Sequence, residues 1–142
     1  MKLVIASDHG GVNLKKAITE HLSEQGIEYT DLGPDSTASV DYPDYAKPVA
    51  EKVAAGEYDK GILICGTGIG MSITANKTKG IRCALVHDTF SAKATRQHND
   101  SNILAMGERV IGQGLALEIV DTWLNTEFEG GRHERRICKI EE

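Results

Sequence analysis

The segment 61–72 joins an apolar run, a thiol and spaced glycines, and it restricts the possible folds of this chain more than any other segment. Residues 62–64 are continuously apolar, which is typical of a strand covered on both faces of a parallel sheet. Cys65 ends this predicted strand. Glycines then follow at alternate positions, at Gly66, Gly68 and Gly70. We therefore expect a sharp turn that leads into a helix over residues 72–77.

This turn is suited to anion binding beside a reactive thiol. Backbone N–H groups at the start of a helix can face a negatively charged ligand. The positive end of the helix dipole also favours the thiolate form of Cys65. The segment thus indicates a base or nucleophile next to an oxyanion-binding loop. It fits equally well a tight strand-to-helix turn that ends in an inert buried thiol.

Two common nucleotide-binding motifs lie close to this glycine spacing, but neither is complete. The dinucleotide fingerprint needs a third glycine where this chain has Met71, and a P-loop needs a Gly-Lys-Ser/Thr ending that is absent. A dinucleotide- or anion-binding module remains an alternative, because Asp88 follows the next predicted strand about 20 residues after the loop. A Cys–His acyl hydrolase is a second alternative, since a thiolate near a histidine can act as a nucleophile.

Predicted strands alternate with helical patterns along the whole chain. Strands are expected at 3–6, 27–32, 62–65, 81–86 and 103–106, and helical stripes begin at Leu14, Tyr45, Ser72, Thr89 and Leu115, with Pro48 in a first turn. Such alternation predicts an α/β fold, a three-layer doubly wound (Rossmann-like) sheet of five parallel strands. At this length we expect a single domain over residues 1–142.

Polar segments follow several predicted strands, and ligands bind beyond the carboxyl ends of strands in such sheets. The segments expected to meet at this edge are Asp8-His9, 65–70, His87-Asp88 and 107–109. His98-Asn99 comes at the end of a helical segment and does not follow from this rule.

The last residues, 130–142, differ from the rest of the chain. After Gly130-Gly131, basic residues occur at helical spacing on one face, at Arg132, Arg136 and Lys139, and isoleucines on another. This pattern predicts a helical arm with a basic face that docks elsewhere or on a partner. An ordinary solvated face is the alternative.

Composition excludes several classes of protein. A net charge of −5 is unfavourable for nucleic-acid binding. Three cysteines without C-x-x-C spacing argue against a disulfide framework or a cysteine zinc site and favour reduced thiols in the cytoplasm. No stretch resembles a signal peptide or is long enough to span a membrane.

The candidate residues together fit an aldose–ketose isomerase. That reaction needs a base for a carbon-bound proton, donors for an enediolate oxygen and an acid/base that opens the cyclic sugar, and it needs no metal. Cys65, the loop N–H groups and a histidine can supply these functions, while arginines hold a phosphate. Plainer roles remain open: Asp8 as a helix cap, His98 as a solvated helix end, and Cys83 and Cys138 in packing.

Six blocks of the chain, in order, resemble the type B ribose-5-phosphate isomerase family, which also includes galactose-6-phosphate isomerase subunits and relatives acting on allose 6-phosphate. One branch of that family has a glutamate where Met71 stands, so this chain resembles the cysteine branch. The blocks cover nearly the whole chain and are residues 7–11, 39–43, 65–72, 96–100, 107–110 and 130–136.

The resemblance implies a role for each matching residue. Cys65 moves a proton between C1 and C2, and N–H groups from Gly66 to Ser72 stabilise the enediolate. His98 opens the furanose ring, assisted by Asp8 and Thr67. Three further residues are expected to contact the sugar hydroxyls: Asp41, Tyr42 and Asn99. Four residues are expected to bind the phosphate: His9, Arg109, Arg132 and Arg136.

The resemblance also implies a homodimer, in some members paired into a tetramer, with sites between subunits and no cofactor. His9, Arg132 and Arg136 are then expected to serve the partner's pocket. Ribose 5-phosphate, of the pentose phosphate pathway, is favoured over allose 6-phosphate or galactose 6-phosphate. Galactose-6-phosphate isomerase divides its function between two unlike subunits, whereas this chain carries all the residues itself.

Overall fold

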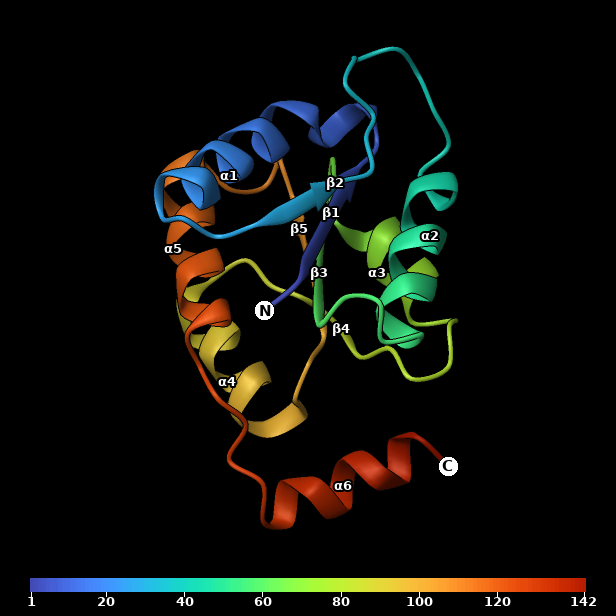
Figure 1. Cartoon of the computed structure of the whole chain (residues 1–142), viewed down its shortest axis with the longest axis vertical. Helices are drawn as coiled ribbons and strands as arrows, with labels where there is room; N and C mark the ends of the chain where they lie inside the picture. Colours follow the sequence, from blue (N-terminus) through green and yellow to red (C-terminus); the bar gives the residue numbers. More distant parts are fainter.

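In the computed structural model, which describes residues 1–142, five parallel strands form one sheet in the order β2-β1-β3-β5-β4 (Figure 1). Every neighbouring pair is parallel, as predicted. The strands are β1 (Leu3–Ser7), β2 (Tyr29–Asp31), β3 (Lys60–Cys65), β4 (Cys83–Leu85) and β5 (Ile103–Gly107). The order places β3, the strand that ends in Cys65, at the centre of the sheet.

Helices cover both faces of this sheet and make three layers (Figure 1). They are η1 (His9–Gly11), α1 (Val12–Glu24), α2 (Pro43–Ala54), α3 (Ile69–Ala75), α4 (Thr89–Asn99), α5 (Gln113–Leu124) and α6 (Arg132–Ile140). Helices α1, α4 and α5 pack on one face, and α2 and α3 on the other. The predicted α/β fold is confirmed.

Alternate residues of each strand supply two hydrophobic cores. In β1, Leu3 and Ile5 pack toward α1 and α5, whereas Val4 and Ala6 pack toward α2 and α3. All four are 1% exposed or less, as expected for a strand covered on both faces. Burial of each large apolar side chain contributes about 1.5–3 kcal/mol, so these cores fix the position of the strand ends.

Some element boundaries differ from those predicted. Helix α3 begins at Ile69, three residues before Ser72, because Gly68 already takes the left-handed conformation (φ 78°) that ends the turn. Pro48 lies inside α2 rather than in its first turn, and Pro43 occupies the start of that helix. Strand β4 spans only Cys83–Leu85 within the predicted 81–86.

Helix α6 lies apart from the three layers, beyond the end of the sheet where the chain enters its strands (Figure 1). It contacts α4, and of its residues only His133 and Ile137 are buried. The arm expected at residues 130–142 is therefore a helix on the side opposite to the loop after Cys65. None of the helices has both the length and the apolar character needed to cross a membrane.

Candidate active site

The Cys65 side chain lies at the carboxyl end of β3 and is 6% exposed. The N–H of Gly68 donates a hydrogen bond to its Sγ, with a separation of 3.0 Å. This donor stabilises negative charge on the sulfur. The turn from Cys65 to Gly68 thus places a thiol at the start of α3, as the glycine spacing predicts.

The glycine turn leaves several backbone donors free. The N–H of Ser72 donates to the carbonyl of Gly68 inside α3, and that of Ile69 donates to Thr67 Oγ1. Four N–H groups of the segment have no acceptor within the chain, those of Gly66, Thr67, Gly70 and Met71. These groups, rather than that of Ser72, are available to a developing oxyanion.

The turn rests directly on the end of β5. A Cβ atom on Gly107 would come within 2.6 Å of the Cα of Thr67, so only glycine allows this approach. The N–H of Gly107 donates to His87 Nε2 at 2.9 Å, which joins the ends of β4 and β5. Burial lowers the pKa of His87, and the nearby Asp88 carboxylate partly opposes this effect.

The loop after β1 lies beside the same turn. A Cβ on Gly10 would lie 3.2 Å from the amide nitrogen of Gly66. Asp8, largely buried, accepts a hydrogen bond from the Gly10 N–H at 2.8 Å and caps η1. The capping role considered for Asp8 is therefore present, and it holds the carboxylate at the carboxyl edge of the sheet.

The segment between β2 and α2 also reaches this edge. The Val40 N–H donates to His9 Nδ1 at 3.1 Å. Nδ1 therefore acts as an acceptor, and the neutral ring carries its hydrogen on Nε2. The Tyr42 ring packs on Gly70, where an added Cβ would lie 2.7 Å from it. His9 and the Asp41-Tyr42 pair therefore lie, like Cys65, at the carboxyl ends of the strands.

Arg109 also lies beside the turn that follows Cys65. Its N–H donates to the carbonyl of Gly66 at 3.0 Å, and its side chain lies over that glycine. The preceding residue, Glu108, is fixed by an N–H bond to the Cys65 carbonyl and by accepting the Leu14 N–H at 2.6 Å. The structure thus brings together the predicted residues that follow strands: Asp8, His9, Asp41, Tyr42, Cys65, Gly66, Thr67, Gly68, Gly70 and Arg109.

The other predicted residues lie at the opposite edge of the sheet. His98 and Asn99 end α4, which leads into the start of β5, and Arg132 and Arg136 belong to α6 (Figure 1). The strand β3 alone separates the two edges by about 16 Å, at about 3.3 Å per residue. Within one chain, therefore, His98 does not meet Cys65.

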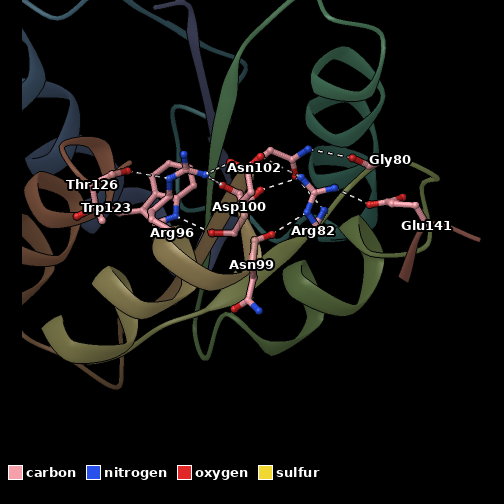
Figure 2. Close-up of polar contacts among 10 residues, drawn as sticks. Gly80, Arg82, Arg96, Asn99, Asp100, Asn102, Trp123, Thr126 and Glu141 are labelled. Carbon is pink, nitrogen blue, oxygen red and sulfur yellow. Dashed lines mark hydrogen bonds and ion pairs between the residues drawn. The ribbon is translucent and has the colours of Figure 1, made fainter. Parts of the chain in front are cut away.

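A polar network fixes this second edge (Figure 2). Arg82 donates to the carbonyls of Asn99 and Asp100, each at 2.8 Å, and pairs with Glu141 after α6. Arg96 donates to the Asp100 carboxylate at 2.8 Å and to the Ser101 carbonyl at 2.7 Å. The end of α4 and the arm are consequently held as one unit.

Two residues without a predicted role contact His98. The rings of His98 and His133 stack with centroids 4.5 Å apart, and the Glu129 carboxylate lies 3.9 Å from His98 Nε2 and 3.4 Å from His133 Nε2. Burial lowers the pKa of His133, and the neighbouring Arg132 lowers it further, whereas the Glu129 carboxylate raises it in part. Sequence patterns gave no sign of this contact because about thirty residues separate its two segments.

The other two cysteines are distinct from Cys65. Burial raises the pKa of the Cys83 thiol to about 12, although a hydrogen bond to Ser72 opposes this, so it stays protonated. Cys138 is exposed on α6, and none of the three thiols forms a disulfide. The expected packing role agrees with the environment of Cys83 but is wrong for Cys138, which is exposed.

Known proteins resemble this chain over nearly its whole length. The pattern of the family described as "Ribose/Galactose Isomerase" matches residues 3–140. The chain belongs to the ribose/galactose isomerase family. Among its relatives, a putative sugar phosphate isomerase of Bacillus subtilis, YwlF, is 72% identical over 141 residues, covering 99% of this chain and 95% of that protein.

Solved structures of the ribose/galactose isomerase family share the fold over nearly the whole chain. Ribose-5-phosphate isomerase B of Clostridium thermocellum superposes with a TM-score of 0.98 at 56% identity, covering 99% of this chain and 95% of that one. Ribose-5-phosphate isomerase B of Mycoplasma genitalium, solved with bound ribulose 5-phosphate, gives a TM-score of 0.95 at 47% identity, covering 99% and 93%.

Proposed function

We propose that this protein interconverts ribose 5-phosphate and ribulose 5-phosphate through a cis-enediolate. The observation that carries the proposal is the Cys65 thiol, which accepts the Gly68 N–H and lies beside backbone donors without acceptors. The relatives from Clostridium and Mycoplasma, named as ribose-5-phosphate isomerases, support the choice of substrate.

Cys65 is the base in this proposal. Its thiolate takes the proton from C2 of the open-chain aldose, and the C–H electron pair forms a C1–C2 double bond as negative charge moves to the carbonyl oxygen. Free loop N–H groups, such as those of Gly66 and Gly70, stabilise that charge. Proton transfer from the oxygen at C2 to the oxygen at C1, and return of the Cys65 proton to C1, complete the ketose.

Ring opening and substrate binding use the remaining residues. His98 opens the furanose ring, with Asp8 and Thr67 assisting. The phosphate is held by positive side chains, and sugar hydroxyls by polar ones. The phosphate contacts are His9, Arg109, Arg132 and Arg136, and the hydroxyl contacts are Asp41, Tyr42 and Asn99.

A complete site on this proposal needs two chains. Cys65 and His98 lie at opposite edges of one sheet, and a two-fold dimer can place the His98 edge of one subunit over the Cys65 edge of the other. Apolar side chains exposed near the Cys65 turn favour such contact: Ile69, Ile73, Leu85 and Phe90, which are 40–81% exposed.

This arrangement assigns the predicted residues to two half-sites. His9 serves the pocket of its own chain, because it lies beside Asp8 and the glycine turn, whereas Arg132 and Arg136 serve the pocket of the partner. Residues 1–142 act as one domain whose arm, 130–142, reaches the second subunit. The three unpaired thiols favour a cytoplasmic location.

The test is conversion of ribose 5-phosphate to ribulose 5-phosphate with a chelator present, with allose 6-phosphate assayed alongside. We expect turnover by the parent and a loss of at least about 100-fold in kcat for Cys65→Ala, because the proton acceptor is removed. Cys83→Ala is the control, since burial keeps that thiol protonated. Full activity of Cys65→Ala would contradict the proposal, and faster turnover of allose 6-phosphate would change the substrate.

A further inference from the structure

The Glu129 carboxylate faces two imidazole rings at the amino edge of the sheet. One oxygen, Oε1, lies 3.4 Å from His133 Nε2 and 3.9 Å from His98 Nε2. None of the three side chains makes a hydrogen bond elsewhere in the chain. Their candidate ligand atoms all lie within 4.8 Å of one another.

We propose that His98, Glu129 and His133 form a binding site for a divalent transition-metal ion such as Zn²⁺, and that occupation of this site inhibits the isomerase. Two imidazole nitrogens and one carboxylate oxygen are a common Zn²⁺ ligand set, which leaves a fourth position for water or substrate. The inhibitory effect depends on the proposed function, because a nitrogen of His98 that binds metal cannot exchange a proton with the sugar ring.

The burial of the three residues is consistent with closure around an ion. His133 is 6% exposed and supplies a buried ligand, whereas the side chains of His98 and Glu129 are 46% and 49% exposed to solvent. Zn²⁺ bonds to nitrogen and oxygen are about 2.0–2.2 Å long, so shifts of these two side chains can bring all three within bonding distance.

Among the charged groups around this site, the Glu129 carboxylate is the one that favours binding of a metal ion. Arg132 and Arg136 lie on the same helix as His133 and oppose binding of a cation. A carboxylate at this position is unfavourable for binding phosphate but supplies the negative charge that a metal ion needs. We therefore expect Glu129→Gln to weaken metal binding, while the isomerase, in which Glu129 has no assigned role, keeps its basal turnover.

The experiment must separate this site from the thiols, because Zn²⁺ also binds thiolates. Zn²⁺ binding is measured by competition with a chromophoric chelator, without substrate, and inhibition is measured at the same free Zn²⁺ concentrations. The parent is compared with Glu129→Gln and with Cys138→Ser, which removes the exposed thiol of the same helix. Co²⁺ substituted for Zn²⁺ reports thiolate ligation through its charge-transfer absorption.

We expect the parent to bind one ion per chain, its inhibition to be reversed by the chelator, and its Co²⁺ form to show no thiolate charge-transfer band. Glu129→Gln should raise the Zn²⁺ concentration for half-inhibition at least about tenfold, and Cys138→Ser should leave it unchanged. Equal sensitivity of parent and Glu129→Gln overturns the proposal, as does absence of binding. Binding without inhibition overturns its inhibitory half. A parent that binds Zn²⁺ but does not turn over ribose 5-phosphate contradicts the proposed function and leaves the metal site standing.

Discussion

At the scale of single residues, two glycines share a left-handed backbone conformation but differ in how closely other atoms pack against them. Gly68 and Gly56 have φ of 78° and 79°, but a Cβ on Gly68 would lie 2.8 Å from the Met106 carbonyl carbon, whereas Gly56 has open space around it. We expect Gly56→Ala to lower the free energy of unfolding by about 1 kcal/mol, from the left-handed conformation alone.

The same substitution at Gly68 should cost about 3 kcal/mol or more, because overlap with the backbone of β5 adds to the strain. Urea unfolding of both variants at one protein concentration checks the difference. Equal losses would mean that the turn moves away from β5 without cost. Gly68→Ala should also lose most isomerase activity, because the added Cβ displaces the turn and with it the backbone N–H that donates to the Cys65 sulfur.

At the scale of secondary-structure elements, His87 joins the ends of β4 and β5 by accepting the Gly107 N–H, which requires a neutral Nε2. Burial lowers its pKa below the ordinary value of about 6.5, although the Asp88 carboxylate raises it in part. The unfolded chain therefore binds this proton more readily than the folded one. The contribution of His87 to stability is complete above about pH 6.5 and falls as the pH drops toward the lowered folded pKa.

Unfolding free energies of the parent and His87→Gln, measured from about pH 7.5 to 5.5, test this linkage. Glutamine does not titrate, and its amide oxygen can accept the Gly107 N–H. We expect the parent to lose stability more steeply than His87→Gln below about pH 6.5. Parallel curves for the two proteins would show that His87 does not cause the pH dependence.

At the scale of the whole molecule, the separation of Cys65 and His98 predicts that each active site uses two subunits. In the proposed dimer, Cys65→Ala and His98→Asn chains that are unfolded and refolded together form heterodimers. In a shared site, one of the two pockets of each heterodimer receives an intact Cys65 and an intact His98. Each variant refolded alone has none.

Because random mixing makes half of the dimers heterodimers, with one active pocket each, we expect about a quarter of the parent activity from two inactive variants. The readout is turnover of ribose 5-phosphate after refolding, with each variant refolded alone as control. No recovery, in a mixture shown to contain heterodimers, would place the complete site within one chain.

The sequence by itself determined the fold and one half of the candidate site. Apolar runs at 3–6, 62–64 and 103–106 are signals of local periodicity, and parallel strands bring the polar residues that follow them to one edge. The alternation of strands and helices thus located Asp8, Cys65 and Arg109 together without any knowledge of contacts. The glycine spacing likewise predicted the close turn, because only glycine allows its backbone approaches.

Only the tertiary structure decided where the second half lies and which donors are free. The position of His98 depends on the insertion of β5 between β3 and β4 and on the anchoring of α6 through Arg82 and Glu141, which are contacts between distant segments. The stack of His98 on His133 and the engagement of the Ser72 N–H inside α3 are of the same kind. Such contacts arise from packing in three dimensions, and local patterns of sequence do not encode them one by one.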